Sequence, residues 1–283
     1  MVAVKLATIR NGGATRAVRI DTDAAVELDA PDVGAVLQRD GWQTWAAAAT
    51  GATHAVAGLD YAPLVPNPDK IICVGLNYKG HIAETGAETP AFPILFAKYR
   101  ASLVGAHDDV VLPETTESES TDYEAELAVI IGTRARRVSK ADALGVVGGY
   151  AVCNDVSVRD WQRRTTQFLQ GKTWERSTPL GPWLVTPDES PGPDREISCE
   201  VNGEVLQHST TSDLLFDVAA VVAYASTIIT LEPGDVIATG TPSGVGMARK
   251  PPRWLQDGDV MVTRIEGLGE CRNVCRRPAR AAV

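Results

Sequence analysis

The fold is decided by the stretch Tyr123-Glu124-Ala125-Glu126-Leu127-Ala128-Val129-Ile130-Ile131-Gly132. Its apolar, β-favouring residues 127–131, closed by a glycine, predict a buried strand. Because side chains alternate along a strand, Glu124 and Glu126 point to the same face, with Cα atoms roughly 6.6 Å apart. Like charges this close in an apolar setting need a cation between them. Taken alone, the pattern is more typical of an exposed strand end with two solvated glutamates, so further ligands are required.

Composition places the chain among globular proteins and narrows its partners. Of its 283 residues, 44% are hydrophobic and 22% charged. The net charge of −9 argues against nucleic acid or an anionic membrane as a partner. No run of 18 apolar residues occurs, and residues 1–10 lack the apolar region of a signal peptide. Five cysteines without a C-x-x-C pair favour reduced, mostly buried thiols in a cytoplasmic protein.

The first 65 residues predict a small β-rich domain. Strands over Val2–Ile9 and Thr15–Ile20 flank the turn sequence Asn11-Gly12-Gly13, which favours a hairpin. The segment Ala46–Thr53 is too rich in alanine for a core strand and favours a helix. Prolines 63, 66 and 68 then indicate a linker. We therefore expect residues 1–65 and 66–283 to form separate domains.

Residues 66–283 predict a mainly β catalytic domain, so the fold class is α+β. The longest predicted helix, Asp213–Ile229, has apolar residues at a 3.6-residue period, with Thr210 placed to cap it. A short helix is expected over residues 77–86, ended by Gly86. The predicted strands are 71–75, 94–97, 127–131, 149–153, 183–186, 197–201, 235–239 and 260–265.

A third carboxylate strengthens the case for a metal. The apolar strand 149–153 ends at Asn154-Asp155, which places Asp155 at a strand terminus. By itself Asp155 is more typical of an Asx turn or a helix cap than of a metal ligand. With Glu124 and Glu126 it completes an all-oxygen site, which suits Mg²⁺ or Mn²⁺, with Ca²⁺ as a possible substitute.

Three further positions carry candidate chemistry. His81 and Glu84 are neighbours on one helical face, as a general base and its orienting carboxylate would be, although surface pairs share this spacing. Lys172, after Gly171, is placed to stabilise an enolate or oxyanion, although an ordinary exposed lysine would fit the same position. It is not part of a P-loop, because Thr166 replaces the first glycine of that motif. The hydroxyl of Thr241 follows a predicted strand and is placed to bind a carboxylate, although this segment is equally consistent with a simple tight turn.

Together these motifs resemble the signatures of the fumarylacetoacetate hydrolase family, in the family's order over residues 70 to 265. The resemblance rests on segments of this sequence: Gly75-Leu76-Asn77-Tyr78 with His81 and Glu84, Tyr123 to Leu127, Asn154 to Ser157 with Arg159, Asp160 and Gln162, Gly171-Lys172, and Thr239 to Gly246. It implies a mixed β-sandwich roll, usually a homodimer, with a small extra N-terminal domain.

The resemblance also implies roles for individual residues. Glu124, Glu126 and Asp155 match the metal ligands, and His81 with Glu84 matches a dyad on a lid that activates water. Lys172 would steady a developing enolate. Substrate contacts are implied for Arg159, Gln162 and Thr241, with Lys98 as a further candidate. The chain departs from the family at Glu175, where aspartate is common, which leaves the surroundings of the lysine open.

These parts predict a metal-dependent hydrolase of carbon–carbon bonds. The expected substrate is a 2,4-dioxo acid of the acylpyruvate or fumarylpyruvate type, chelated by the metal and attacked by water that His81 has deprotonated. Two alternatives use the same enolate, namely an oxaloacetate decarboxylase and an isomerase or decarboxylase of the 2-hydroxyhepta-2,4-diene-1,7-dioate type. An alternative of another class is a non-catalytic protein that binds 2-oxo acids.

Overall fold

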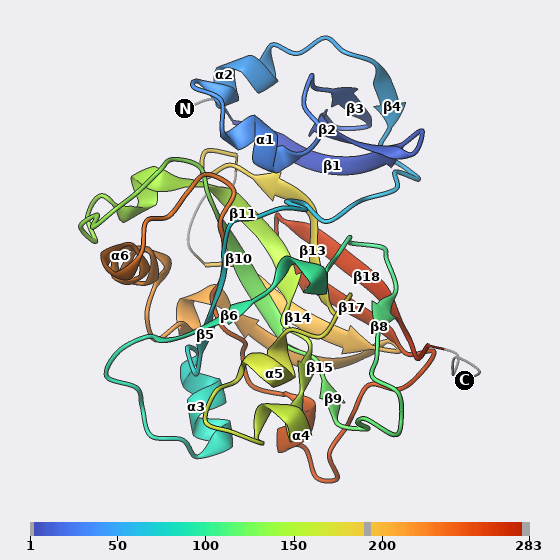
Figure 1. Ribbon diagram of the computed structural model, residues 1–283, viewed down its shortest axis with the longest axis vertical. Coiled ribbons are helices and arrows are strands. Elements are labelled where there is room, and N and C mark those ends of the chain that lie inside the picture. The colour runs from blue at the N-terminus through green and yellow to red at the C-terminus, as the bar shows by residue number, and fades with distance from the viewer. Residues whose placement is uncertain (1–2, 190–193, 279–283) are drawn as a thin grey trace.

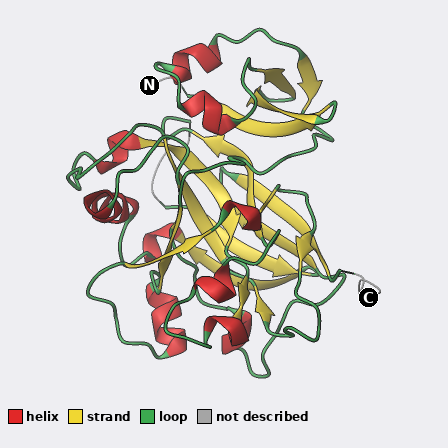
Figure 2. Ribbon diagram, viewed as in Figure 1, coloured by secondary structure: helices red, strands yellow, loops and turns green. Residues whose placement is uncertain are grey.

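The computed structural model describes residues 3–189 and 194–278 and is mainly β with mixed sheets, as the sequence predicts. Strands run through the centre of the molecule and helices lie on its outside (Figure 2). Val2, the first residue of the first predicted strand, lies outside the described residues.

A long sheet runs through both predicted domains. Its strand order is β4-β3-β2-β1-β13-β11-β10-β16-β5-β6, with β7 paired to β13. In chain order these strands are β1 (Lys5–Asn11), β2 (Ala14–Ile20), β3 (Ala24–Glu27), β4 (Thr53–Ala55), β5 (Ile71–Gly75), β6 (Ile94–Lys98), β7 (Leu103–Val104), β10 (Ala125–Ile131), β11 (Val147–Asn154), β13 (Thr178–Val185) and β16 (Val236–Ala238).

A second sheet packs against the first. Its order is β15-β14-β17-β18-β8, and β12 and β9 form a separate pair. The bounds are β8 (Val110–Val111), β9 (Thr121–Asp122), β12 (Ser157–Val158), β14 (Glu196–Val201), β15 (Glu204–Thr210), β17 (Val260–Ile265) and β18 (Gly269–Arg276). Apolar side chains of both sheets meet in one core, to which β10 contributes Leu127, β14 contributes Ile197 and β17 contributes Met261. This packing makes the sandwich that the family resemblance implies.

Short helices lie around the sheets. They are α1 (Val33–Leu37), α2 (Trp42–Ala47), α3 (Lys79–Thr85), α4 (Arg159–Gln162), α5 (Leu169–Lys172) and α6 (Val218–Ile228), with 3₁₀ turns η1 (Arg100–Ser102), η2 (Ala143–Val146), η3 (Thr211–Asp213) and η4 (Gly246–Ala248). Figure 1 shows α3, α4 and α5 together at the end of the molecule opposite the N-terminal unit. Among the described residues, no helix is long and apolar enough to cross a membrane.

The N-terminal hairpin is present, and its strands extend the long sheet. Strand β1 pairs antiparallel with β13, matching Leu6 with Leu184. The predicted division of the chain near residue 65 therefore stays a prediction, because the sheet continues across it. The expected helix over Ala46–Thr53 is wrong in position: α2 lies over Trp42–Ala47, and Thr53 begins β4. The early start buries Trp42 against the same apolar core as Val36.

The longest helix begins later than its periodicity predicts. It covers Val218–Ile228, and its N-cap is Asp217, whose carboxylate accepts from the N–H of Ala220. Thr210 instead caps the turn η3. The reason is a competing partner: the Asn77 side chain accepts from the N–H of Phe216 and donates to its carbonyl, and residues 215–216 form a bend instead of a helical turn.

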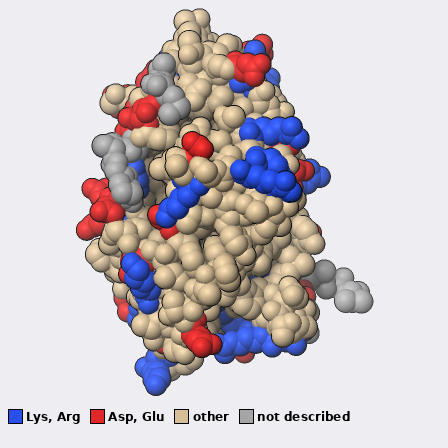
Figure 3. Space-filling model, turned by 90° about the vertical axis from the view of Figure 1, so that its left-hand side faces the viewer, with Lys and Arg blue, Asp and Glu red and all other residues tan. Residues whose placement is uncertain are grey.

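The outer side of α6 is apolar. Ile228 is 59% exposed, and Phe92, which is 69% exposed, stacks on Tyr224 of this helix. The side of the molecule on which α6 lies in Figure 1 faces the viewer in Figure 3, and charged groups there are scattered around a broad uncharged middle. All five cysteines are buried and unpaired, in agreement with the expectation of reduced thiols.

Candidate metal centre and its cavity

Three buried carboxylates meet at the ends of β10 and β11. One oxygen from each of Glu124, Glu126 and Asp155 lies within 4.8 Å of the others. Glu126 belongs to β10, Glu124 precedes that strand, and Asp155 follows β11, its antiparallel neighbour. The side chain of Asn154 fixes the alignment, since its Oδ1 accepts from the N–H of Glu124 at 3.0 Å. Residues 31 positions apart in the sequence are thereby brought into one cluster.

Two buried lysines neutralise part of this charge. The Nζ atom of Lys172 lies 2.5 Å from Oε2 of Glu124 and 2.8 Å from Oδ2 of Asp155. The Nζ atom of Lys98 lies 2.6 Å from Oδ1 of Asp155. Both lysines are almost fully buried, so these are strong charge-assisted contacts. Asp155 is held from both sides.

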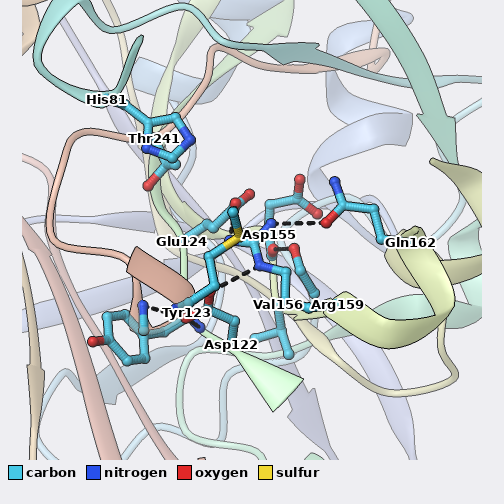
Figure 4. A network of polar contacts seen from close by, with 12 residues as sticks. His81, Asp122, Tyr123, Glu124, Asp155, Val156, Arg159, Gln162 and Thr241 are labelled. Carbon is cyan, nitrogen blue, oxygen red and sulfur yellow. Dashed lines mark hydrogen bonds and ion pairs between the residues drawn. The ribbon is translucent and has the colours of Figure 1, made fainter. Parts of the chain in front are cut away.

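Arg159 connects the cluster to a fourth acid. Its Nη2 donates to Glu124 at 2.5 Å, its Nε to Asp122 at 2.8 Å and its Nη1 to Gln162 at 2.9 Å. Asp122 also accepts from the N–H groups of Gly246 and Met247. Asp122 therefore links Arg159 to the loop that contains Gly246 and Met247. Figure 4 draws the polar contacts of Asp122 and of Arg159.

Burial and neighbouring charges move the pKa values of the carboxyls in opposite directions. Burial alone would raise the pKa of Glu124, but the charges of Arg159 and Lys172 outweigh it and hold that pKa well below its usual range. Burial raises the pKa of Glu126 far above its usual range, and the negative charges of Asp155 and Glu124 add to this. Of these two glutamates, Glu126 is thus the one whose negative charge is less balanced by neighbouring positive groups.

The residues present fit a hard divalent cation. The cluster offers carboxylate oxygens alone, which Mg²⁺ and Mn²⁺ prefer over zinc's usual nitrogen and sulfur ligands. Within the described chain, the one hydrogen-bond donor to the Glu126 carboxylate is the N–H of Gly240, at 2.8 Å. No cation of the described protein lies within ion-pairing distance of Glu126. An external cation would supply the missing positive charge.

A cavity of about 370 Å³ opens beside the cluster. Its lining includes most of the predicted site residues: His81, Glu124, Glu126, Arg159, Gln162, Lys172 and Thr241. In Figure 4, His81 and Thr241 lie on one side of Glu124, and Gln162 lies on the other. Aromatic side chains, Phe96 and Phe168, form part of the remaining wall and pack edge to face at 5.7 Å. The cavity therefore has a charged floor and walls that are partly polar and partly apolar.

His81 is oriented by its neighbour on α3. Its Nδ1 lies 3.1 Å from Oε2 of Glu84, and the other oxygen of Glu84 accepts from the N–H of Gly244 at 2.7 Å. Because Glu84 accepts, Nδ1 carries the proton and Nε2 is left as the proton acceptor. The helix ends where predicted, at Gly86, whose φ of 66° suits glycine.

Lys98 does not line this cavity in the described structure, because its ammonium group is buried against Asp155. The substrate contact that the resemblance implies for Lys98 stays a prediction, and in this structure its charge is paired with Asp155. Glu175 is exposed and makes no ion pair with Lys172, whose ion-pair partners in the described structure are Glu124 and Asp155.

Two glycines allow the close contacts of the site. Gly240, at φ 103°, donates to Glu126, and a Cβ there would lie 2.9 Å from the Cβ of Asn77. A Cβ on Gly171 would lie 2.5 Å from the Cα of Gln162. Any larger residue at 171 would push α5 from α4 and displace Lys172.

Sequence reasoning missed the residues that support the site. Asp122 continues the two-residue alternation of Glu124 and Glu126 backwards, which is a signal that could have revealed it. Gln207 gives no such signal. Its side chain accepts from the N–H of Ala125 and donates to Thr241 Oγ1 at 2.8 Å, so it positions both β10 and a cavity hydroxyl.

Comparison with known proteins agrees with this geometry. The sequence profile described as Fumarylacetoacetate (FAA) hydrolase C-terminal matches residues 70–276. The chain belongs to the fumarylacetoacetate hydrolase family. A mitochondrial oxaloacetate tautomerase of Rattus norvegicus is 46% identical over 207 residues, covering 72% of this chain and 66% of the relative. The chain thus matches just under two thirds of that relative's length.

Solved structures of the family are similar over nearly the whole chain. A putative HpcE protein from Mycobacterium smegmatis has a TM-score of 0.88 and 37% identity, covering 97% of this chain and 100% of that one. A 2-hydroxyhepta-2,4-diene-1,7-dioate isomerase from Mycobacterium marinum has a TM-score of 0.82 and 32% identity, covering 98% and 100%. For a maleylpyruvate hydrolase from Sphingobium the values are 0.80 and 30%, covering 97% and 100%. Family members therefore differ in the reaction their names state.

Proposed function

We propose that this protein is an enzyme that interconverts the keto and enol forms of a 2-oxo acid of the oxaloacetate type. The observation that carries the proposal is the buried cluster of Glu124, Glu126 and Asp155, whose two glutamates line one cavity with Lys172 and His81. The relative named as an oxaloacetate tautomerase supports this choice. The sequence alone predicted hydrolysis of a carbon–carbon bond first and enolate chemistry without water as the alternative, so this proposal reverses their order.

The three carboxylates would hold Mg²⁺ or Mn²⁺, with Ca²⁺ as a substitute. When bound, such an ion supplies a Lewis acid that polarises a keto group. Lys98 and Lys172 keep Asp155 fixed between them, and Gly240 orients Glu126. The protein thereby presents its ligand oxygens before any ion arrives, which lowers the cost of ordering them on binding.

His81 is the group proposed to move the proton. With Nδ1 held by Glu84, its Nε2 can take a proton from the carbon next to the keto group. Tautomerisation then needs only return of a proton to the keto oxygen, and no bond of the carbon skeleton breaks. Glu84 acts by orienting the imidazole and is a positioning residue.

Other cavity residues would bind and shield the acid. The amide of Gln162 and the hydroxyl of Thr241 lie on its wall, held by Arg159 and by Gln207 respectively. The buried ammonium of Lys172 is kept charged: burial lowers its pKa, but Asp155 and Glu124 outweigh this and raise it. A lysine that stays charged can stabilise negative charge developing on a keto oxygen.

Hydrolysis of an acylpyruvate is the second candidate. The similarity to a maleylpyruvate hydrolase favours it, as does the position of His81 on the cavity wall, where the same Nε2 could deprotonate a water. Decarboxylation of oxaloacetate and isomerisation of a dienedioate share the initial proton transfer. A homodimer and a cytoplasmic location stay predictions, and the tautomerase relative is named as mitochondrial.

A substrate panel tests the proposal. Purified protein with Mg²⁺ or Mn²⁺ is given oxaloacetate and several acylpyruvates, and products are followed by proton NMR. We expect faster exchange between enol and keto oxaloacetate, without pyruvate formation above the uncatalysed rate. Pyruvate released from an acylpyruvate would favour the hydrolase instead. Binding without turnover of any 2-oxo acid would contradict both reactions and support the binding-protein alternative.

His81→Ala serves as the control in that panel. It should abolish turnover while the binding of a substrate analogue persists. Unchanged turnover would remove His81 and Glu84 from the mechanism.

A further inference from the structure

We propose that Arg163 recognises a second carboxylate at the far end of the substrate, which makes the enzyme selective for 2-oxo dicarboxylates. This inference rests on the proposed function and deepens it, because it names the substrate class of the same cavity. Arg163 was not among the predicted site residues. It follows Gln162 in the sequence and caps the C-terminal end of α4.

Arg163 differs from the other cations that line the cavity. Both Lys172 and Arg159 are buried and already form ion pairs. Lys172 pairs with Glu124 and Asp155. Arg159 pairs with Asp122 and Glu124. Arg163 is exposed at the cavity wall and forms no ion pair with any residue of the described chain. Among the described residues, the one side-chain hydrogen bond of its guanidinium is from Nη2 to Sδ of Met247, at 3.7 Å.

Met247 places this charge within the cavity, because Met247 also lines it. The backbone holds Arg163 firmly: its N–H donates to the carbonyl of Arg159 at 3.1 Å. A weak contact to a thioether leaves the guanidinium's donors available for a ligand. A guanidinium with free donors is well suited to bind a carboxylate with two parallel hydrogen bonds.

Charge balance in the cavity gives the second argument. The cluster and the groups paired with it comprise four carboxylates and three cations: Asp122, Glu124, Glu126 and Asp155 against Lys98, Arg159 and Lys172. With the carboxylates ionised, this set has one negative charge in excess. A divalent ion and the 2-oxo carboxylate would together bring it to neutrality. A second carboxylate on the substrate then needs one more positive charge, and Arg163 supplies it.

The cavity also has an apolar part of its lining, which suits the carbon chain of such an acid. Phe96 and Phe168 line the cavity together with Val74, and their apolar faces offer nothing to a charged group. The lining also has neutral polar groups, such as Gln162 and Thr241, but among the described lining residues Arg163 is the one lysine or arginine without an ion pair to a carboxylate. A substrate with charge at both ends and carbon between them matches this pattern.

A matched pair of variants tests the assignment. Arg163→Gln removes the charge at the cavity, whereas Arg164→Gln removes an adjacent charge that lies 3.5 Å over the ring of Trp161 and does not line the cavity. The probes are 2-oxoglutarate and 2-oxopentanoate, five-carbon acids that differ in the distal carboxylate. Their dissociation constants are measured by calorimetry in the presence of Mg²⁺, so turnover is not needed.

We expect the wild-type protein and Arg164→Gln to bind 2-oxoglutarate about tenfold more tightly than 2-oxopentanoate, the size of one charge-assisted contact. Arg163→Gln should lose that preference and bind 2-oxopentanoate as the wild type does. A preference that survives Arg163→Gln, that disappears equally in Arg164→Gln, or that is absent from the wild type would overturn the inference. If the wild type binds neither acid, both the proposed function and the inference are contradicted. If the wild type binds both acids equally well, only the role of Arg163 is contradicted.

Discussion

The main chains of Glu124 and Asp155 are joined by a hydrogen bond of 2.8 Å, in which the N–H of Asp155 donates to the carbonyl of Glu124. Asn154 closes the arrangement, because its side-chain oxygen accepts from the N–H of Glu124 and its amide donates to Thr263 at 2.8 Å. The spacing of two proposed metal ligands is therefore set by backbone and amide contacts beneath them.

Replacing Asn154 should loosen this spacing. Asn154→Ala leaves the buried N–H of Glu124 without an acceptor, which should cost about 1–3 kcal/mol of unfolding free energy. It should also weaken Mn²⁺ binding by about 10- to 100-fold, as loss of a group that orients ligands does. Thr263→Ala is the control, since it leaves the bond to Glu124 in place. If both variants bind Mn²⁺ equally well, Asn154 does not set the ligand geometry.

Glu84 should affect catalysis more than binding. Glu84→Gln keeps the shape of the side chain but weakens the hold on the His81 imidazole. We expect kcat to fall by about 100-fold, the lower range for general acid–base effects, with little change in the affinity for a substrate analogue. Steady-state kinetics with a calorimetric binding measurement separate the two. An equal loss of affinity would indicate instead that the contact with Gly244 shapes the cavity.

The start of α6 can be tested through its cap. Asp217→Ala removes the acceptor for the N–H of Ala220 and should lower the unfolding free energy by about 1 kcal/mol. Thr210→Ala should leave α6 intact, because Thr210 caps η3. Urea unfolding of both variants provides the measurement. A larger effect for Thr210 would mean that the helix begins where the sequence periodicity predicts.

A carboxylate in the N-terminal unit should make stability depend on pH. The bond from His54 holds the pKa of Glu27 below its usual value, and Asn11 assists it. A lowered pKa means that the folded state favours the ionised form, so this stabilisation is present above the ordinary carboxyl pKa and is lost as the pH falls through the folded value.

The wild type should therefore melt a few degrees above Glu27→Gln at neutral pH, and the two melting temperatures should converge in acid. Thermal unfolding followed by circular dichroism at several pH values checks this. A difference that grows as the pH falls would have the opposite sign and refute the assignment.

Much of the fold could be predicted from local patterns. Alternation over residues 127–131 and the turn at Asn11-Gly12-Gly13 depend on neighbours in the sequence, and β10 and the first hairpin follow them. The start of α6 could not be predicted, because it depends on Asn77, some 140 positions away. The pairing of β1 with β13 is equally non-local.

The same distinction holds for the site. Acids at strand ends and the His81–Glu84 spacing are visible in the sequence. The structure gathers the three acids in one cluster and places His81, Glu124 and Glu126 around one cavity. The direction of a long side chain is not visible. Lys98 reaches Asp155 from β6, and Arg163 turns to Met247, and both follow from tertiary packing.

The proposed function depends most on one divalent ion held by Glu124, Glu126 and Asp155. Titration of the metal-free protein with Mn²⁺, followed by electron paramagnetic resonance, tests this directly. We predict one tightly bound ion per chain in the wild type and at least a 100-fold loss of affinity in Glu126→Gln, whose folded structure should persist because the amide oxygen still accepts from Gly240. Equal affinity in the two proteins, or no bound ion in the wild type, would contradict the central claim.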